Sequence, residues 1–270
     1  DSGAGTLREA LERLQPNTTI TFDPAVFPAD HPVTIALESP LPEIASDHLT
    51  IDASNAGVIL DGSKLQDGSG LRIYSFYNRI MGLQIVHFPQ HGIDLQGGNS
   101  TVGGDRTIGT GPMGQGNRLS GNGWYGLRVG GSGQTVLGNY VGTDLAGEEP
   151  DPNFDGIFIT ETRDITVGSV IPGEGNLISG NRSINIDSWG DHTRIFGNII
   201  GLNASGTKAM NPDTGSNVTL ESNVMNTVVG GTTPGERNII SGAGFGVVFS
   251  DPNSYQCAVV GNYIGTDITG

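Results

Sequence analysis

Asn176-Leu-Ile-Ser-Gly180, followed after an apolar stretch by Gly197-Asn-Ile-Ile-Gly201, is one copy of the phrase that decides the fold. The other copies begin at Asn117 and Asn238, so the period is 59 and then 62 residues. A long, regular period is typical of solenoids, in which each unit packs only on its neighbours. The phrase therefore predicts an elongated body of stacked units.

Each long period contains two shorter units, and each unit has a segment in which two apolar residues flank one variable residue. This period-2 alternation indicates a strand with one buried face. We expect the buried pairs to be Ile93/Leu95, Leu127/Val129, Ile157/Ile159, Ile184/Ile186, Val218/Leu220 and Val247/Phe249. Another strand of each unit is expected to bury Val102, Val136, Val167, Ile195, Val228 and Val259. Three short strands per unit predict one turn of a parallel β-solenoid.

Asparagines recur at one position of every unit, directly after a glycine in most copies. They are Asn117, Asn139, Asn176, Asn198, Asn238 and Asn262. In rungs about 4.8 Å apart, side-chain amides can hydrogen-bond along the stack and to backbone groups at the corners. We therefore expect a structural asparagine ladder with no direct part in chemistry.

Residues 1–23 differ from the repeats. Apolar residues at positions 7, 10, 11 and 14 form one face of a helix, and Thr6 with Glu9 forms a capping box at its start. We expect this short helix to cap the apolar end of the first rung, because solenoid ends need a polar cover. Less regular strands are expected after it, then regular rungs over 91–270, so that 1–270 is a single β-helix domain. The expected early strands are residues 18–23, 33–37, 49–52, 58–60, 71–74 and 79–88.

The charge of the chain excludes several classes of partner. Its formal net charge is −15 and its sequence pI is about 4.5. Binding to phosphate backbones needs clustered Lys and Arg, and no such cluster occurs, so we expect no nucleic-acid partner. No apolar run approaches the length of a membrane span, so we expect no membrane insertion. Cys257 is the only cysteine, so no intrachain disulfide forms.

Two stretches carry a resemblance to a known family. Asp1-Ser-Gly-Ala-Gly-Thr-Leu-Arg-Glu-Ala10 with residues 19–27 is similar to the amino-terminal cap of secreted bacterial β-helix proteins of the CSLREA type, with Thr6 in place of the usual cysteine. The repeated phrases, such as Asn238-Ile-Ile-Ser-Gly242 and Gly261-Asn-Tyr-Ile-Gly265, resemble the rungs of the same proteins. The resemblance implies an all-β fold, a right-handed, single-stranded parallel β-helix of the pectate-lyase-like kind. It also implies a secreted, extracellular or bacterial cell-surface location. Its members include adhesins, envelope proteins and polysaccharide-degrading enzymes, so it leaves the activity open.

The candidate catalytic residues lie on the strand that carries the apolar pairs. Its outward residues form a column of Gln96, Gly130, Thr160, Asp187, Glu221 and Ser250, so Asp187 and Glu221 are expected to be neighbours about 5 Å apart at their backbones. They are the candidate catalytic pair, because two close carboxylates can provide an acid and a base or bind Ca²⁺. Candidate substrate-binding residues around them are Glu161, Trp189, Asp191, His192 and Asp251. No further cofactor or metal site is expected.

Each of these features also has an ordinary structural interpretation. An acidic, water-facing strand carries carboxylates without any catalytic role. Trp124, Tyr125 and Trp189 could form a platform for sugar rings or could simply pack at corners. A second outward column, Asp94, Arg128, Phe158, Asn185, Thr219 and Val248, has the composition of ordinary surface. No metalloprotease, serine-hydrolase, phosphate-loop or Cys-x-x-Cys motif occurs.

The last residues match the middle of a repeat, because Thr266-Asp-Ile-Thr-Gly270 corresponds to Thr143-Asp-Leu-Ala-Gly147. We expect an uncapped final rung, which would be continued by more chain or would dock on another copy by end-to-end stacking.

The sequence favours a secreted, non-catalytic β-helix that acts as a rigid surface, matrix, adhesive or fibre-forming element. The alternatives are a polysaccharide-active enzyme (a lyase, hydrolase or epimerase) and a carbohydrate-binding module that uses the outward face. The expected partner is a polysaccharide or cell-envelope component, or a second copy of the chain.

Overall fold

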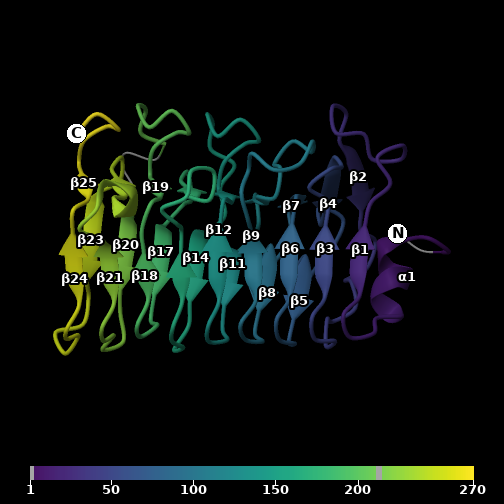
Figure 1. Ribbon diagram of the computed structural model, residues 1–270, viewed down its shortest axis with the longest axis horizontal. Coiled ribbons are helices and arrows are strands. Elements are labelled where there is room, and N and C mark those ends of the chain that lie inside the picture. The colour runs from purple at the N-terminus through teal and green to yellow at the C-terminus, as the bar shows by residue number, and fades with distance from the viewer. Residues whose placement is uncertain (1–2, 211–214) are drawn as a thin grey trace.

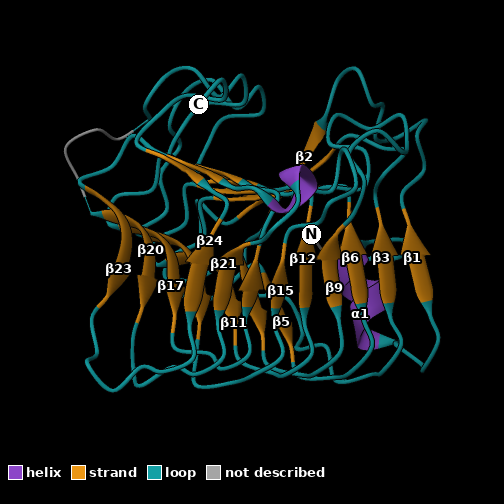
Figure 2. Ribbon diagram, turned by 60° about the vertical axis from the view of Figure 1, so that its left-hand side comes forward, coloured by secondary structure: helices purple, strands orange, loops and turns teal. Residues whose placement is uncertain are grey.

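The computed structural model describes residues 3–210 and 215–270, and it is a right-handed parallel β-helix. Within these residues the strands form three parallel sheets, which we call A, B and C (Figures 1 and 2). Sheet A consists of β1 (Thr19–Thr21), β3 (Thr50–Asp52), β6 (Arg79–Met81), β9 (Thr101–Gly103), β12 (Thr135–Leu137), β15 (Thr166–Val167), β18 (Arg194–Ile195), β21 (Val228–Gly230) and β24 (Ala258–Val260). Sheet B consists of β2 (Val33–Ala36), β4 (Val58–Asp61), β7 (Leu83–Val86), β10 (Arg118–Ser120), β13 (Tyr140–Val141), β16 (Leu177–Ile178), β19 (Ile199–Ile200), β22 (Ile239–Ile240) and β25 (Tyr263–Ile264). Sheet C consists of β5 (Leu71–Ile73), β8 (Ile93–Leu95), β11 (Tyr125–Val129), β14 (Asp155–Ile159), β17 (Ile184–Ser188), β20 (Ser216–Leu220) and β23 (Phe245–Phe249).

The chain visits the sheets in the order A, B, C and then starts the next rung. Each strand pairs in parallel with the strand one rung away, as β11 does with β8 and β14. The three-strand unit expected from the repeat is therefore confirmed. The first rung has no strand in sheet C, but the isolated bridge between Ile44 and Ile73 continues that sheet toward the N-terminus.

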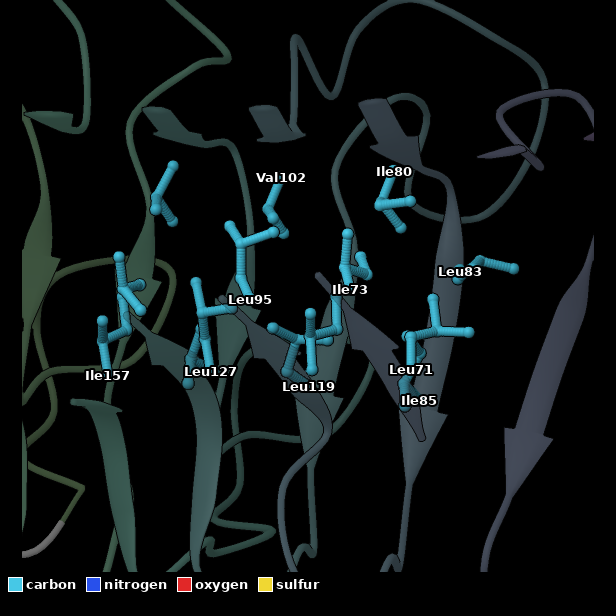
Figure 3. Close-up of a cluster of buried hydrophobic side chains, with 14 of the residues drawn as sticks. Leu71, Ile73, Ile80, Leu83, Ile85, Leu95, Val102, Leu119, Leu127 and Ile157 are labelled. Carbon is cyan, nitrogen blue, oxygen red and sulfur yellow. The ribbon is translucent and has the colours of Figure 1, made fainter. Parts of the chain in front are cut away.

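Inward side chains of successive rungs stack into one continuous apolar core. Figure 3 shows Leu95, Leu127 and Ile157 of neighbouring rungs lying along the axis, with Val102 and Ile80 facing them from sheet A. All five are fully buried. Burial of one such side chain stabilises the fold by about 1.5–3 kcal/mol, so the regular repeat of Ile, Val and Leu is the main apolar contribution.

The register expected from the sequence is wrong at two strands. In β17 the residues in line with Ile157 and Ile159 are Ile186 and Ser188, so the expected pair Ile184/Ile186 is displaced by two residues. Ile184 instead pairs with Ser216 and lies outside the core. Alternation alone leaves both pairs available, and the hydrogen-bond register of the neighbouring strands selects the one that includes a serine.

The second displacement is in sheet A, where Val229 and not Val228 lies in line with Ile195 and Val259. Val229 is fully buried, whereas Val228 is partly exposed. Two adjacent valines make the buried position ambiguous in the sequence, because a shift of one residue exchanges the two faces of a strand.

The asparagine ladder is confirmed, and it lies at the corner between sheets A and B. Each asparagine Nδ2 donates to the Oδ1 of the next asparagine along the axis at 2.9–3.1 Å. The same Oδ1 accepts the backbone N–H of the preceding asparagine at 2.9–3.1 Å. Nδ2 also donates to a carbonyl of sheet A, such as Val136 O for Asn176 at 2.9 Å. The ladder therefore satisfies its own amides and the corner backbone together.

A second asparagine ladder, which we did not predict, lies at the corner between sheets B and C. It runs through Asn122, Asn153, Asn181, Asn185 and Asn217, with Nδ2–Oδ1 distances of 2.8–2.9 Å. All five are buried. Their irregular sequence spacing, which includes two members four residues apart, conceals the column in the sequence.

The N-terminal cap is the helix α1 (Leu7–Glu12), which covers the first rung at the purple end of Figure 1. Leu7 and Leu11 are buried against the core, as expected from the helical face. Thr6 Oγ1 accepts the backbone N–H of Glu9 at 3.3 Å. The Glu9 carboxylate accepts the N–H of Gly5 at 2.6 Å, one residue earlier than in a capping box.

The long loops leave the two corners that flank sheet B, and Figure 1 shows them together on one side of the β-helix. They include the turn η1 (Pro234–Glu236). The opposite corner, from sheet C to sheet A, is short in every rung. Among the described residues, no helix has the length and apolar character required to cross a bilayer.

Removal of one asparagine side chain from the ladder should destabilise the protein strongly. In Asn198→Ala the backbone N–H of Asn176 loses its partner, the carbonyls of Val167 and Phe196 each lose one donor, and Asn238 loses a donor to its oxygen. We expect the free energy of unfolding to fall by about 3 kcal/mol, because buried polar groups are left unpaired. Urea unfolding followed by circular dichroism measures this change. The exposed Asn253→Ala is the control, and an equal effect of both substitutions would contradict a structural role of the ladder.

Candidate functional site

The outer face of sheet C carries the densest group of aromatic and charged side chains, and its strands place them in three parallel columns. The first column is His91, Tyr125, Asp155, Ile184, Ser216 and Phe245; the second is Asp94, Arg128, Phe158, Asp187, Thr219 and Val248; the third is Gln96, Gly130, Thr160, Trp189, Glu221 and Ser250. Successive members of a column belong to neighbouring rungs, so each pair lies about 4.8 Å apart at the backbone. The sheet is a regular grid on which side chains are displayed.

Three aromatic rings cross this grid diagonally, one per rung. Tyr125, Phe158 and Trp189 come from the first, second and third columns, with centroid separations of 4.7 Å and then 5.4 Å. The rings are inclined by 37° and 88°, so they form a stepped surface. His91 extends the row because it stacks on Tyr125 at 5.0 Å with nearly parallel planes, and Trp124 meets His91 edge-on at 5.5 Å.

Three carboxylates follow a second diagonal, one rung beyond the aromatic one. They are Asp155 in the first column, Asp187 in the second and Glu221 in the third. Asp155 and Asp187 are only 6% and 8% exposed. Asp155 accepts the backbone N–H of Ile184 at 2.8 Å, and Asp187 accepts the indole N–H of Trp189 at 3.1 Å. The acidic row is therefore anchored to the aromatic row.

The environment of Asp187 favours its protonated form. Burial, followed by the negative charges of Glu221 and Asp155, raises the pKa of Asp187 to about 7, against a weaker opposing effect of the Trp189 hydrogen bond. Burial also raises the pKa of Asp155. A carboxyl group that exchanges its proton near neutral pH can act as an acid or a base.

At the other end of the face, the negative charge of a carboxylate is neutralised by an arginine. The carboxylate of Asp94 pairs with Arg128 at 3.1 Å and accepts the amide of Gln96 at 2.5 Å. Burial lowers the pKa of His91 to about 4, although the charge of Asp94 opposes this shift. His91 is therefore a neutral ring at physiological pH, and it is buried against Tyr125 at the end of the row.

The expected column that joined Asp187 directly to Glu221 is wrong. Asp187 lies in line with Phe158 and Thr219, and Trp189 occupies the place next to Glu221. The cause is the displaced register of β17, which also moves Asn185 out of the second column and into the asparagine ladder. Asp187 and Glu221 remain diagonal neighbours, close enough for the charge of Glu221 to raise the pKa of Asp187.

The expected substrate-binding residues divide into two groups. Glu161, Trp189 and Asp191 line one hollow of about 630 Å³ at the edge of sheet C, together with Arg163 and Met225. Asp191 also accepts the backbone N–H of Met225 at 2.8 Å, which fixes the corner.

His192 and Asp251 do not line this hollow and have roles in turns. The ring of His192 contacts Asn226 Nδ2 at 3.2 Å. Asp251 accepts the backbone N–H of Asn253 at 2.9 Å. A contact between neighbouring rungs accounts for His192 and a short-range turn bond accounts for Asp251, in neither case with a ligand.

Our sequence interpretation missed Asp155 and Phe158 as parts of the site. Phe158 was assigned to ordinary surface, and Asp155 precedes the apolar pair of its strand. The signal that could have identified them is the strand register. When β17 is aligned correctly with β14 and β20, both diagonals lie on one face of sheet C.

In the part of the chain that the structure describes, no group of three or more His, Cys, Asp or Glu side chains is arranged to hold a metal ion. The Ca²⁺ interpretation of the acidic residues therefore gains no support from the geometry.

Comparisons with known proteins assign the chain to no family. The chain matches no protein-family model, no curated protein and no solved structure.

The raised pKa of Asp187 should make stability depend on pH. A carboxyl whose pKa is higher in the folded state stabilises the fold below its unfolded pKa, near 3.8, and this contribution is lost as the pH rises to about 7. Asp187→Asn cannot ionise, so at pH 8 it should be more stable than the parent chain by about 2 kcal/mol, an estimate that allows for screening by solvent at the edge of the face.

Urea unfolding at pH 4 and pH 8 measures the effect, and the difference between variant and parent should shrink at the lower pH. Asp251→Asn, at a turn, is the matched control and should show no such pH-dependent gain. A carboxyl resonance of Asp187 that titrates near pH 4 in carbon-detected NMR would disprove the assignment.

Proposed function

We propose that this protein is a rigid, extracellular β-helix that binds a polysaccharide chain across the outer face of sheet C. The observation that carries the proposal is the aromatic diagonal of Tyr125, Phe158 and Trp189 on three successive rungs. The C–H faces of pyranose rings are apolar, and aromatic rings combine a large apolar surface with, in Tyr and Trp, a polar group for hydrogen bonding. An extended row of rings suits an extended ligand better than a compact one.

The charge of the face favours a neutral polysaccharide over a polyuronate. Asp155, Asp187 and Glu221 border the aromatic row, and the chain as a whole carries a net charge of −15. Carboxylates of a uronic-acid polymer would be repelled there, whereas hydroxyl groups of a neutral sugar can donate hydrogen bonds to the acidic row.

A scaffold or adhesive role is compatible with this binding face. Two asparagine ladders and three continuous sheets hold the grid of side chains in a fixed register. Such rigidity lowers the entropic cost of binding, because the rings are already in place. The extracellular location rests on the resemblance of residues 1–10 and of the repeats to secreted bacterial β-helix proteins.

Truncation of the aromatic diagonal should weaken polysaccharide binding. We expect Trp189→Ala and Phe158→Ala each to reduce affinity about tenfold, equivalent to about 1.4 kcal/mol. Affinity electrophoresis against a panel of soluble neutral glucans, xylans and mannans, with polygalacturonate alongside, measures this effect. Phe76→Ala is the control, because Phe76 is 48% exposed at a corner outside the diagonal. Loss of retention in the control alone, or tightest binding to polygalacturonate, would contradict the proposal.

Glycosidic-bond cleavage is a second candidate function, and it is favoured by the pKa of Asp187 near 7. In this reaction protonated Asp187 gives its proton to the glycosidic oxygen, the bond from that oxygen to the anomeric carbon breaks, and water attacks the carbon. Glu221, its diagonal neighbour, would accept the proton of the water. Two carboxyl groups in different environments are the usual requirement for this chemistry.

Cleavage is tested separately from binding. If the protein releases reducing ends from any polysaccharide that it binds, Asp187→Asn should reduce the rate at least about a hundredfold while affinity stays within about threefold. Asp251→Asn serves as the control and should keep full activity. Binding without release of reducing or unsaturated ends between pH 5 and pH 8 would exclude the cleavage function and leave the binding function intact.

A further inference from the structure

A second hollow lies on the loop side of sheet B, away from the proposed polysaccharide face. Its volume is about 270 Å³, and it is lined by Leu177 and Ile199 together with the loop of Val170 and Ile171. Arg106 and Arg237 also line it. The guanidinium of Arg106 lies over the ring of Tyr140 in β13, and that of Arg237 lies over Tyr263 in β25. Because β16 and β19 lie between these strands, the two arginines flank the apolar lining.

Neither of these guanidinium groups has a carboxylate within ion-pair distance in residues 3–210 and 215–270. Arg106 Nη1 donates to the carbonyl of Gly175, and Arg237 Nε donates to the carbonyl of Gly261 at 3.1 Å. Arg194 provides a contrast, because it also lies over an aromatic ring, Phe196, but pairs with Glu236 at 3.2 Å. In a chain with a net charge of −15, two arginines that line one hollow without an ion-paired carboxylate are conspicuous.

The conformation of Arg237 leaves its Nη groups available. Its backbone-directed bond uses Nε, and the ring of Tyr263, 4.0 Å from Cζ, fixes the plane of the guanidinium. A planar guanidinium with free N–H groups matches the two oxygens of a carboxylate. The hollow also presents apolar side chains beside Arg237, and those of Val170 and Ile171 at its rim are 54% and 52% exposed.

We propose that this hollow binds a small amphipathic organic anion, whose carboxylate pairs with Arg237 and whose short hydrocarbon body packs on Ile199, Val170 and Ile171. A hollow of 270 Å³ has room for about nine groups of the size of a water molecule, at about 30 Å³ each. That size suits a carboxylic acid of about eight non-hydrogen atoms and is too small for a polymer. The positive charge of Arg106 at the other end adds to the attraction for an anion.

The first test uses the unaltered protein and three six-carbon probes that differ in their head group, which is anionic, neutral or cationic. Hexanoate, hexan-1-ol and hexylamine are titrated separately, and the methyl resonances of Ile199, Val170 and Ile171 are followed by NMR. We expect hexanoate to shift these methyl groups and to bind at least about tenfold more tightly than hexan-1-ol, with no binding of hexylamine. Equal binding of hexanoate and hexan-1-ol, or hexanoate binding that leaves these three residues unshifted, would overturn the proposal.

The second test removes the cation. Arg237→Gln should weaken hexanoate binding about tenfold and abolish its preference over hexan-1-ol, whereas Arg182→Gln, which removes an exposed arginine that does not line the hollow, should leave both affinities unchanged. Near-identical methyl spectra of the free proteins verify that both variants are folded. Tight hexanoate binding by a folded Arg237→Gln variant would overturn the assignment of the carboxylate partner.

Discussion

Hydrogen bonding along the axis is the constraint on which the rest of this structure depends. Parallel strands satisfy each other within the sheets, but the chain must turn three times per rung, and every turn removes backbone groups from the ladder. At the corner between sheets A and B, the amide of an asparagine replaces a missing partner, as Asn176 Oδ1 does for the N–H of Asn139, while its Nδ2 gives Val136 O a second donor. Because a buried unpaired backbone group costs about as much as a whole hydrogen bond contributes, the corner asparagine is as necessary as the apolar core.

The same constraint determines what the outer faces can display. Strand register is set by bonds between neighbouring rungs, so an outward residue acquires fixed neighbours on the rungs before and after it. On sheet C this places Tyr125, Phe158 and Trp189 on one diagonal and Asp155, Asp187 and Glu221 on the next. Neither diagonal is visible as a sequence motif, because each draws one residue from a different column of a different repeat. The arrangement of the site therefore depends on the register between neighbouring strands.

This dependence explains which parts could be predicted from the sequence. The rungs and the ladder at Asn139 and Asn198 repeat with a nearly constant long period, and the cap helix shows an apolar face at helical spacing, so periodicity reveals all three. The register of β17 could not be predicted in the same way, because Ile184 satisfies the alternation as well as Ser188 does, and only pairing with β14 and β20 decides between them. That one displacement also misplaced Asp187, so the expected arrangement of the candidate residues was wrong at this strand.

The strongest physical argument for a function on sheet C is the cost of its carboxylates. Asp94, on the same face, pairs with Arg128, and the half-buried Asp151 pairs with Arg118. Asp155 and Asp187 are as buried as Asp94, yet neither has a lysine or arginine within ion-pair distance among the described residues, and they raise one another's free energy. Burial of a charge without a partner is unfavourable, and stability alone would favour a neutral residue at these positions. A fold with two asparagine ladders and a continuous core can tolerate that cost, and an acidic row that borders the aromatic binding row gives a reason for it.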